Sequence, residues 1–139
     1  MMIHCALSAQ HIQRYAGGLP YVFTGDFNIK PKDPMYRLLT AGTIDAQEPA
    51  RPVNEPGDEW SPLVQPMRSA YVEKNGVEPP FTNWAKVKDD PPFIDTLDYL
   101  FLSPQWRVAA VDPLPEVQGP FPVEEEPSDH LLISATLEL

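Results

Sequence analysis

Small and apolar residues recur at helical spacing near the start of the chain. Within residues 2–16 they follow steps of four, three and four positions: Cys5, Ala9, Ile12 and Ala16. This spacing places them on one side of a helix. We therefore predict a helix over 2–16 that ends at the pair Gly17-Gly18, because glycine commonly follows the last helical residue.

A second, shorter helix is predicted to begin after Asp33. Asp33 suits the N-cap and Pro34 suits the first helical position, where its missing N–H costs nothing. The apolar face of this helix consists of Met35, Leu38 and Leu39. Gly42 marks its end.

Five segments have the apolar content expected of strands: 21–24, 69–72, 97–102, 108–111 and 131–139. The short apolar run 21–24 predicts a buried strand. We expect 97–102 and 108–111 to pair with each other around a turn at Ser103-Pro104. The final segment alternates between apolar and polar residues, as a strand with one buried face does.

Two proline-rich, acidic stretches, 47–66 and 113–127, predict irregular surface loops. Their length makes them candidates for functional segments. The sequence shows no internal repeat, and its 139 residues suit a single domain, which we place at 1–139. Helices mixed with strands predict an α/β or α+β layered fold.

The charge of the chain restricts its chemistry. It carries 20 acidic and 10 basic residues, a formal net charge of −10 at pH 7. A protein that held nucleic acid through phosphate neutralisation alone would be basic. Phosphate chemistry would therefore require a bound cation, which reverses the local field. An acidic surface that serves solubility is the alternative interpretation.

The sequence also indicates a compartment. No apolar stretch approaches the ~20 residues that span a bilayer. Residues 1–18 lack the basic head of a secretory signal. The single cysteine, Cys5, excludes an internal disulfide and favours a reducing environment. We expect an intracellular protein, cytoplasmic, nuclear or in an organelle, without a membrane partner.

Asp26 and Asn28 form the first of three polar clusters, directly after the strand 21–24. Two residues apart on extended backbone, their side chains project to the same side. A carboxylate beside a carboxamide can bind a divalent metal, orient a water or contact a phosphoryl oxygen. The alternative is a simple turn, since Gly, Asp and Asn are common turn residues.

The second polar site is the single acid Asp98, and the third is the pair Asp129 and His130. Asp98 begins an apolar strand, where a carboxylate needs an imidazole or a metal as partner; a strand-edge cap is the alternative. His130 can act as an acid or base near neutral pH, or contact a leaving oxygen. Each cluster alone has a purely structural alternative, a turn for the first and the third and a strand-edge cap for the second. Together, at three predicted strand ends, they favour metal-assisted phosphoryl chemistry.

Four ordered motifs carry a family resemblance: GDFN (25–28), FTNW (81–84), LDYLF (97–101) and SDHL (128–131). They resemble the C-terminal half of the endonuclease/exonuclease/phosphatase superfamily, Mg-dependent phosphodiesterases with a deoxyribonuclease-I-like fold. The stretch MRSAYVEKNGVEPPFTNW (67–84) is similar to one branch of it. That branch holds the carbon-catabolite-repressor deadenylases, nocturnin, the angel proteins and 2′,5′-phosphodiesterase.

The resemblance implies roles for five side chains. Asp26 would orient or activate the attacking water, and Asn28 would contact the scissile phosphate and support the metal. Asp98 would pair with His130, which would bind a phosphoryl oxygen. Asp129 would belong to the metal shell. The implied metal is Mg²⁺, with Mn²⁺ as a substitute, held by Asp26, Asn28 and Asp129.

The FTNW motif implies contacts with substrate. Asn83 would touch the substrate, and the indole of Trp84 would be a surface on which a base stacks. Phe81 is better explained by core packing. His4 and His11 fall in the first predicted helix, where the family has no catalytic histidine, so we interpret both as structural.

The resemblance also implies that much of the family domain is absent. The N-terminal half of the family supplies a metal-binding glutamate, an asparagine and a further histidine, which have no counterpart here. The chain would thus be a partial domain, the C-terminal half of a four-layer αββα sandwich with a mainly antiparallel sheet. Its exposed apolar face would be covered by the missing half or by a second polypeptide.

The expected activity is Mg-dependent phosphodiester hydrolysis at the 3′ end of RNA, as in a poly(A) deadenylase. We expect it to be weak or absent in this chain alone. A nucleotide phosphatase and a 2′,5′-oligoadenylate phosphodiesterase are alternatives within the same class. A non-catalytic remnant that binds RNA or protein is the alternative from a different class.

Overall fold

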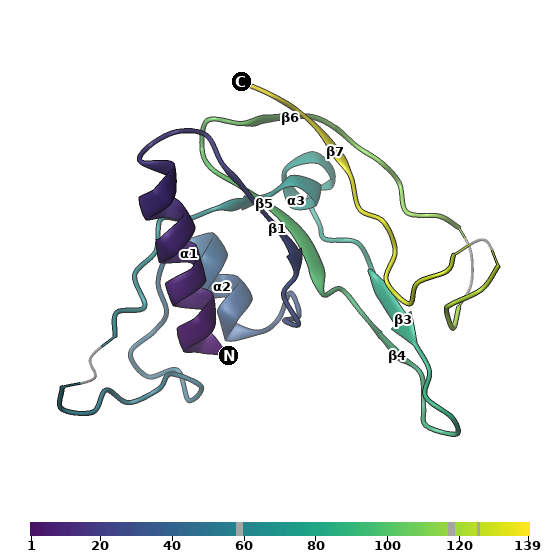
Figure 1. Cartoon of the computed structure of the whole chain (residues 1–139), viewed down its shortest axis with the longest axis horizontal. Coiled ribbons are helices and arrows are strands. Elements are labelled where there is room, and N and C mark those ends of the chain that lie inside the picture. Colours follow the sequence, from purple (N-terminus) through teal and green to yellow (C-terminus); the bar gives the residue numbers. More distant parts are fainter. Residues whose placement is uncertain (58–59, 117–118, 125) are drawn as a thin grey trace.

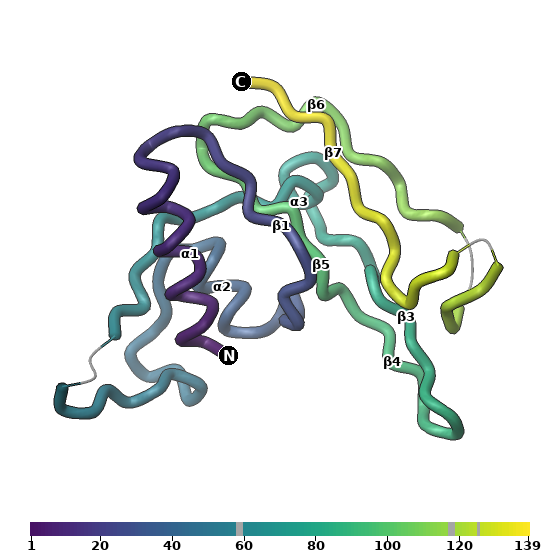
Figure 2. The backbone as a smooth tube through the Cα atoms, viewed as in Figure 1, coloured from purple at the N-terminus to yellow at the C-terminus, as the bar shows by residue number. Residues whose placement is uncertain are grey.

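A computed structural model describes residues 1–57, 60–116, 119–124 and 126–139. In chain order the elements are α1 (Met2–Ala16), β1 (Val22–Asp26), α2 (Pro34–Ala41), β2 (Arg68–Ser69), α3 (Ala70–Asn75), β3 (Asn83–Ala85), β4 (Phe93–Asp95), β5 (Asp98–Leu102), β6 (Arg107–Val111) and β7 (Ala135–Glu138). Figures 1 and 2 show α1 and α2 on one side of β1 and β5, with β6, β7 and the β3–β4 hairpin on the other.

The central strand is β5, which pairs with β1 and β2 in a three-stranded antiparallel sheet of order β1-β5-β2. The β1–β5 register places Val22 opposite Leu102 and Asp26 opposite Asp98. Two smaller antiparallel sheets, β3-β4 and β6-β7, complete the arrangement. The register therefore brings two carboxylates together at one end of the main sheet.

Both faces of β5 are covered by apolar side chains. Tyr99 and Phe101 are fully buried against a cluster that includes Cys5 and Ala9 of α1 and Leu39 of α2. On the opposite face, Leu102 packs in a cluster with residues of α3 and β6. Each large apolar side chain buried in this way contributes about 1.5–3 kcal/mol to folding. This packing holds the start of β5, and with it Asp98, in place.

The predicted helices are confirmed. α1 spans the predicted residues, and Gly17 follows it in the left-handed conformation with φ 58°. Gly42 ends α2 with φ 81°, and a Cβ at this position would lie 2.7 Å from the carbonyl oxygen of Val64. Both the backbone angle and the close approach require glycine there. The predicted mixed α/β class with antiparallel sheets is confirmed as well.

The predicted pairing of 97–102 with 108–111 is wrong. β5 already has β1 and β2 on its two edges, and β6 pairs with β7 instead. The guanidinium of Arg68 binds the carbonyl oxygens of Ser103, Pro104 and Trp106, and so holds the connection between β5 and β6 in a turn. That turn directs β6 away from β5.

Two further strand predictions need correction. The segment 69–72 is not a strand: β2 ends at Ser69, whose hydroxyl accepts a hydrogen bond from the N–H of Val72 and caps α3. The strand predicted at 21–24 is present as β1, which begins at Val22 and continues to Asp26, but it is only partly buried, since residues 21–23 are half-buried and Thr24 is exposed.

The final strand is shorter than predicted, since β7 begins only at Ala135. The N–H of Leu131 binds the carbonyl of Thr82, which aligns the residues before β7 with β3 instead. The predicted loops 47–66 and 113–127 contain no helix or strand among their described residues. Residues 58–59, 117–118 and 125 of these loops lie outside the described residues.

Candidate active site

Asp26, Asp98 and His130 form a compact cluster at one end of the main sheet. Asp26 is the last residue of β1 and Asp98 the first of β5, so antiparallel pairing places them side by side. Nδ1 of His130 lies 2.8 Å from Oδ2 of Asp98. Each of the three residues offers one ligand atom, and these atoms lie within 4.8 Å of one another.

Asn28 binds both oxygens of Asp26. Its backbone N–H donates to Oδ1 at 2.8 Å, and its side-chain Nδ2 donates to Oδ2 at 3.1 Å. A φ of 51° at Asn28 turns the chain back sharply enough for both bonds to form, and asparagine tolerates this conformation better than most residues. Because Nδ2 makes one of these bonds, the amide oxygen is the atom of Asn28 that can bind a cation or face substrate.

Asp129 is tied to β3 through Asn83. The side-chain amide of Asn83 donates to the backbone oxygen of Asp129 at 3.1 Å and lies 3.4 Å from Oδ2 of its carboxylate. A β-bridge joins Asn83 to His130, and the hydroxyl of Ser128 accepts from the N–H of His130 at 3.0 Å. These bonds bring the segment 128–131 beside β3, and so bring His130 to Asp98.

The structure does not bring Trp84 to the cluster. On a strand, neighbouring side chains point to opposite faces, so Trp84 lies on the other face of β3 from Asn83. Its ring packs edge-on against Phe81 and Phe121, with centroids 5.3 and 6.2 Å away. A Cβ at Gly119 would lie 2.7 Å from the indole. The packing of Phe81 against Trp84 agrees with the structural interpretation of Phe81.

Thr82 is a site residue that sequence reasoning missed. Its fully buried hydroxyl donates to Oδ2 of Asp98 at 2.6 Å and accepts from the N–H groups of Leu97 and Asp98 at 2.9 and 3.0 Å. One threonine thus satisfies two backbone donors and orients the carboxylate that meets His130. No local sequence pattern predicts this role, because the residues that Thr82 binds, Leu97 and Asp98, lie about fifteen residues away along the chain.

Phe93 and Lys30 form a further contact that the sequence did not predict. The antiparallel register places Phe93 opposite Ala85, on the same hairpin face as Asn83. Phe93 is 40% exposed, and Nζ of Lys30 lies over its ring, 4.9 Å from the centroid, and 3.0 Å from Oδ2 of Asp95. An exposed aromatic ring beside a lysine is suited to a nucleobase and its phosphate. A single phenylalanine after two prolines gave no signal of this in the sequence.

Opposing influences act on the protonation of His130. Burial lowers its pKa, whereas the hydrogen bond with Asp98 and the negative charges of Asp98, Asp26 and Asp129 raise it; the net result is a raised pKa. The acids therefore favour the imidazolium form. With Nδ1–H donated to Asp98, Nε2 is the nitrogen left to donate to a substrate oxygen.

The donor chemistry of the cluster fits a hard divalent cation. Carboxylate and amide oxygens are the ligands that Mg²⁺ prefers, and Asp26 and Asn28 offer them here. The metal role expected of Asp129 stays a prediction, because its carboxylate lies against the side-chain amide of Asn83 and the ligand atoms that meet belong to Asp26, Asp98 and His130. Mg²⁺ is usually held by one or two carboxylates and completes its shell with water and phosphate oxygens. Asp98 is less available, because its Oδ2 is already bonded to Thr82 and His130. The side chain of Asp98 is 14% exposed, whereas Asp26 is exposed.

Comparison with known proteins identifies the family of this chain. Residues 7–130 match the Endonuclease/Exonuclease/phosphatase family. The chain belongs to this family. The match includes each residue of the cluster, and the resemblance that the four motifs suggested is confirmed. The described fold agrees with a partial domain of the family.

Two curated relatives come from the branch that the sequence resembles. Carbon catabolite repressor protein 4 homolog 4 of Arabidopsis thaliana is 36% identical over 125 residues, and covers 85% of this chain. Nocturnin of Drosophila melanogaster is 27% identical over 147 residues, and covers 92% of this chain. The chain spans only 27% and 21% of the lengths of these two relatives.

The structure also bears on a membrane association. In the described ranges, no helix combines the length and the apolar character needed to cross a bilayer.

Proposed function

We propose that this chain carries the phosphate-binding part of a metal-dependent phosphodiesterase, a 3′-exoribonuclease of the poly(A) deadenylase type. The observation that carries the proposal is the Asp26–Asp98–His130 cluster in a chain of the Endonuclease/Exonuclease/phosphatase family. Similarity to the carbon catabolite repressor homolog and to nocturnin supports the choice of branch.

Each residue of the cluster has a distinct task in this proposal. Exposed Asp26 accepts a hydrogen bond from the attacking water and, with Asn28 and Asp129, holds the cation. Bound Mg²⁺ or Mn²⁺ would neutralise charge on the phosphate. His130, oriented by Asp98, donates from Nε2 to a phosphoryl oxygen, where negative charge grows during in-line displacement.

The proposed substrate is single-stranded RNA at its 3′ end. Phe93 offers a stacking surface on the hairpin face that also carries Asn83, and Lys30 offers a cation beside it. Base stacking tolerates any sequence and suits an enzyme that removes one nucleotide after another. Asn83 is only 3% exposed and its amide is bonded to Asp129, so in this proposal it positions the segment 128–131 and does not itself touch substrate.

We propose further that the chain is a partial family domain and that hydrolysis by it alone is slow. The test uses a 5′-labelled oligo(A) with enzyme in large excess, in millimolar Mg²⁺ or in EDTA. We expect a slow ladder of products shortened from the 3′ end in Mg²⁺ only. The Asp26→Ala variant should leave the oligonucleotide intact.

The outcomes separate the candidate functions. Cleavage that Asp26→Ala retains would show that another protein or another site cuts the RNA. Intact substrate, with Mn²⁺ binding retained in the parent chain, would favour the non-catalytic RNA- or protein-binding remnant. Rapid hydrolysis would contradict the proposed dependence on a further part of the domain. Release of inorganic phosphate from AMP would favour a nucleotide phosphatase instead.

A further inference from the structure

The hydroxyl of Tyr99 joins the two chain segments that carry the carboxylates of the candidate active site. Its oxygen lies 2.8 Å from the carbonyl oxygen of Ile29 and 2.9 Å from that of Thr96. Ile29 directly follows Asn28, and Thr96 precedes Asp98 by two residues. One side chain therefore links the turn after β1 to the residues just before β5.

Tyr99 acts from the face of the sheet opposite to the cluster. It is the neighbour of Asp98 on β5, and neighbouring side chains on a strand point to opposite faces. Asp98 meets Thr82 and His130 on one face. Tyr99, only 1% exposed, belongs to the core cluster with α1 and α2 on the other. Its hydroxyl can thus influence the cluster only through the backbone that it binds.

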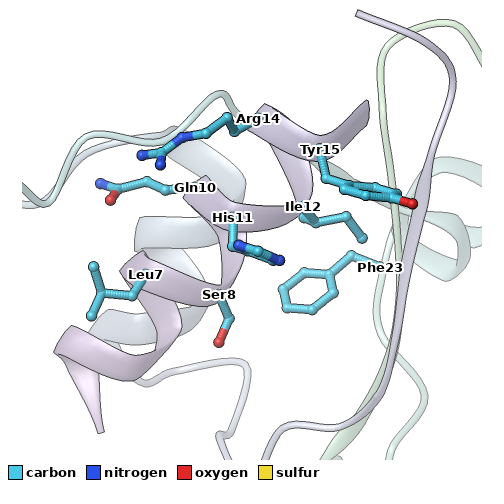
Figure 3. Close-up of a pocket in the computed structure, with 8 residues that line it drawn as sticks. All are labelled: Leu7, Ser8, Gln10, His11, Ile12, Arg14, Tyr15 and Phe23. Atoms are coloured by element: carbon cyan, nitrogen blue, oxygen red, sulfur yellow. The ribbon is translucent and has the colours of Figure 1, made fainter. Parts of the chain in front are cut away.

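Aromatic contacts fix the ring of Tyr99 in this core. The ring stacks on that of Phe101, with centroids 5.1 Å apart, and meets the ring of Phe27 edge-on at 5.9 Å. Phe27 in turn meets Phe23 at 4.8 Å, and Figure 3 shows the ring of Phe23 facing side chains of α1. Side chains packed at this density rest in single rotamers. The core therefore sets the position of the Tyr99 hydroxyl.

The two carbonyl groups depend on this hydroxyl. In the described part of the chain, no other hydrogen-bond donor reaches the carbonyl oxygen of Ile29 or of Thr96. Ile29 is 0% and Thr96 is 1% exposed, so water has little access to replace the donor. Burial raises the pKa of Tyr99, so its hydroxyl keeps the hydrogen that both carbonyls share.

The turn that this bond holds carries the candidate cation ligands. The backbone ladder between β1 and β5 extends to the bond from the N–H of Phe27 to the carbonyl of Leu97, at 2.9 Å. Exposed Asn28 then leaves the strand direction with a φ of 51°, and its N–H and side-chain amide both bind Asp26. The Tyr99 bond fastens the chain again directly after this turn.

We propose that the Tyr99 hydroxyl positions the Asp26–Asn28 turn for cation binding, an inference that rests on the metal-dependent function proposed above. By holding the carbonyl of Ile29 beside that of Thr96, it fixes the direction in which the oxygens of the turn point. Tyr99 is a positioning residue, since it touches neither cation nor substrate. Outer partners of this kind commonly change metal affinity by about 10–100-fold.

The test compares two variants of the whole chain that each lose one phenolic oxygen from the same core. Tyr99→Phe removes the bonds to Ile29 and Thr96. Tyr36→Phe is the matched control, because its ring lies 5.3 Å from that of Tyr99 but its hydroxyl donates to Glu78 at 2.7 Å. Urea unfolding identifies conditions in which both variants are fully folded, and the measurements are made there.

The first measurement requires no metal. Amide exchange followed by NMR reports the N–H of Asn28, which donates to Oδ1 of Asp26 at 2.8 Å. We expect several-fold faster exchange at Asn28 in Tyr99→Phe than in the parent, and no change in Tyr36→Phe. The N–H of Ser103, at the far end of the β1–β5 ladder, is the reference for general loosening.

The second measurement is the Kd of Mn²⁺, read from the electron paramagnetic resonance of the free ion. We expect Tyr99→Phe to raise this Kd roughly tenfold. Tyr36→Phe should retain the Kd of the parent, although it too loses a buried hydrogen bond. A purely structural role of Tyr99 would not separate the two variants in this way.

Three results would overturn the proposal. These are equal exchange at Asn28 in the two variants, an equal Kd of Mn²⁺ in the two variants, and exchange in Tyr99→Phe that is faster at Ser103 to the same degree as at Asn28. A parent chain that binds no Mn²⁺ would contradict the proposed metal-dependent function instead. In that case the amide exchange still decides whether Tyr99 holds the turn.

Discussion

Thr82 donates a hydrogen bond of 2.6 Å to Oδ2 of Asp98, the same oxygen that lies 2.8 Å from Nδ1 of His130. The hydroxyl of Thr82 also accepts bonds from two backbone N–H groups. A hydroxyl has one hydrogen to donate and two lone pairs to accept with, so Thr82 uses its full capacity. The orientation of His130 therefore depends on a residue that touches neither metal nor substrate.

Replacement of Thr82 should reveal this dependence. Thr82→Val keeps the shape but leaves two backbone N–H groups and one carboxylate oxygen short of a partner, at a cost of about 1–3 kcal/mol for each group left buried and unsatisfied. Thr82→Ser keeps the hydroxyl and serves as the matched control. Urea unfolding measures the loss. Equal stability of the two variants would contradict the role given to the hydroxyl.

Binding of a divalent cation should stabilise the fold. A ligand at ten times its Kd adds about 1.4 kcal/mol to the free energy of unfolding. We expect millimolar Mg²⁺ to raise the Tm and EDTA to reverse the rise, with NaCl of matched ionic strength as reference. Asp26→Asn should reduce the gain, whereas Glu55→Gln, outside the cluster, should retain it. The same gain in both variants would place the cation elsewhere.

Loss of the Phe93 ring should weaken binding of single-stranded RNA. Stacking on an aromatic side chain contributes about 1–3 kcal/mol per base, and Phe93→Ala removes it. Phe93→Tyr keeps an aromatic face, and Val87→Ala alters another exposed apolar residue between β3 and β4. Anisotropy of labelled oligo(A) measures the change in Kd. If Phe93→Ala and Val87→Ala have equal effects, the ring has no special contact with RNA.

Glu78 should make the stability of the fold depend on pH. Burial raises the pKa of this carboxyl above 4.5, and hydrogen bonds from Tyr36, at 2.7 Å, and from Ser69 only partly offset it. From pH 4.5 up to the raised pKa, the native chain holds a proton that the unfolded chain has released. The free energy of unfolding therefore falls as the pH rises through this window, and the loss persists above it.

Replacing Glu78 with glutamine, which does not titrate, tests whether Glu78 causes this pH dependence of the free energy of unfolding. Glu78→Gln can still accept a bond from Tyr36 but carries no charge at any pH, so we expect the fall attributable to Glu78 to be missing. Urea unfolding of the parent and the variant between pH 4 and 8 measures the difference, and Glu55→Gln should behave as the parent does. Parallel curves for Glu78→Gln and the parent would refute the prediction.

Local patterns were sufficient where the interactions are local. The helical spacing over 2–16, the Asp33-Pro34 start and Gly42 predicted both α1 and α2, because caps and apolar spacing act within a few residues. Strand partners were less predictable. The turn at Ser103-Pro104 suggested a hairpin, but Arg68, more than thirty residues earlier, binds the connection and β2 occupies that edge of β5.

The sequence by itself determined the family, the mixed α/β class and the identity of the polar residues, since these follow from ordered motifs and from local spacing. Only the tertiary structure decided how those residues meet. It placed Asp26 opposite Asp98, joined His130 to Asp98, set Thr82 behind that carboxylate and turned Trp84 away. The physical reason is that strand register and strand partners depend on contacts between segments far apart in the chain. Such contacts cannot be predicted from the spacing of neighbouring residues.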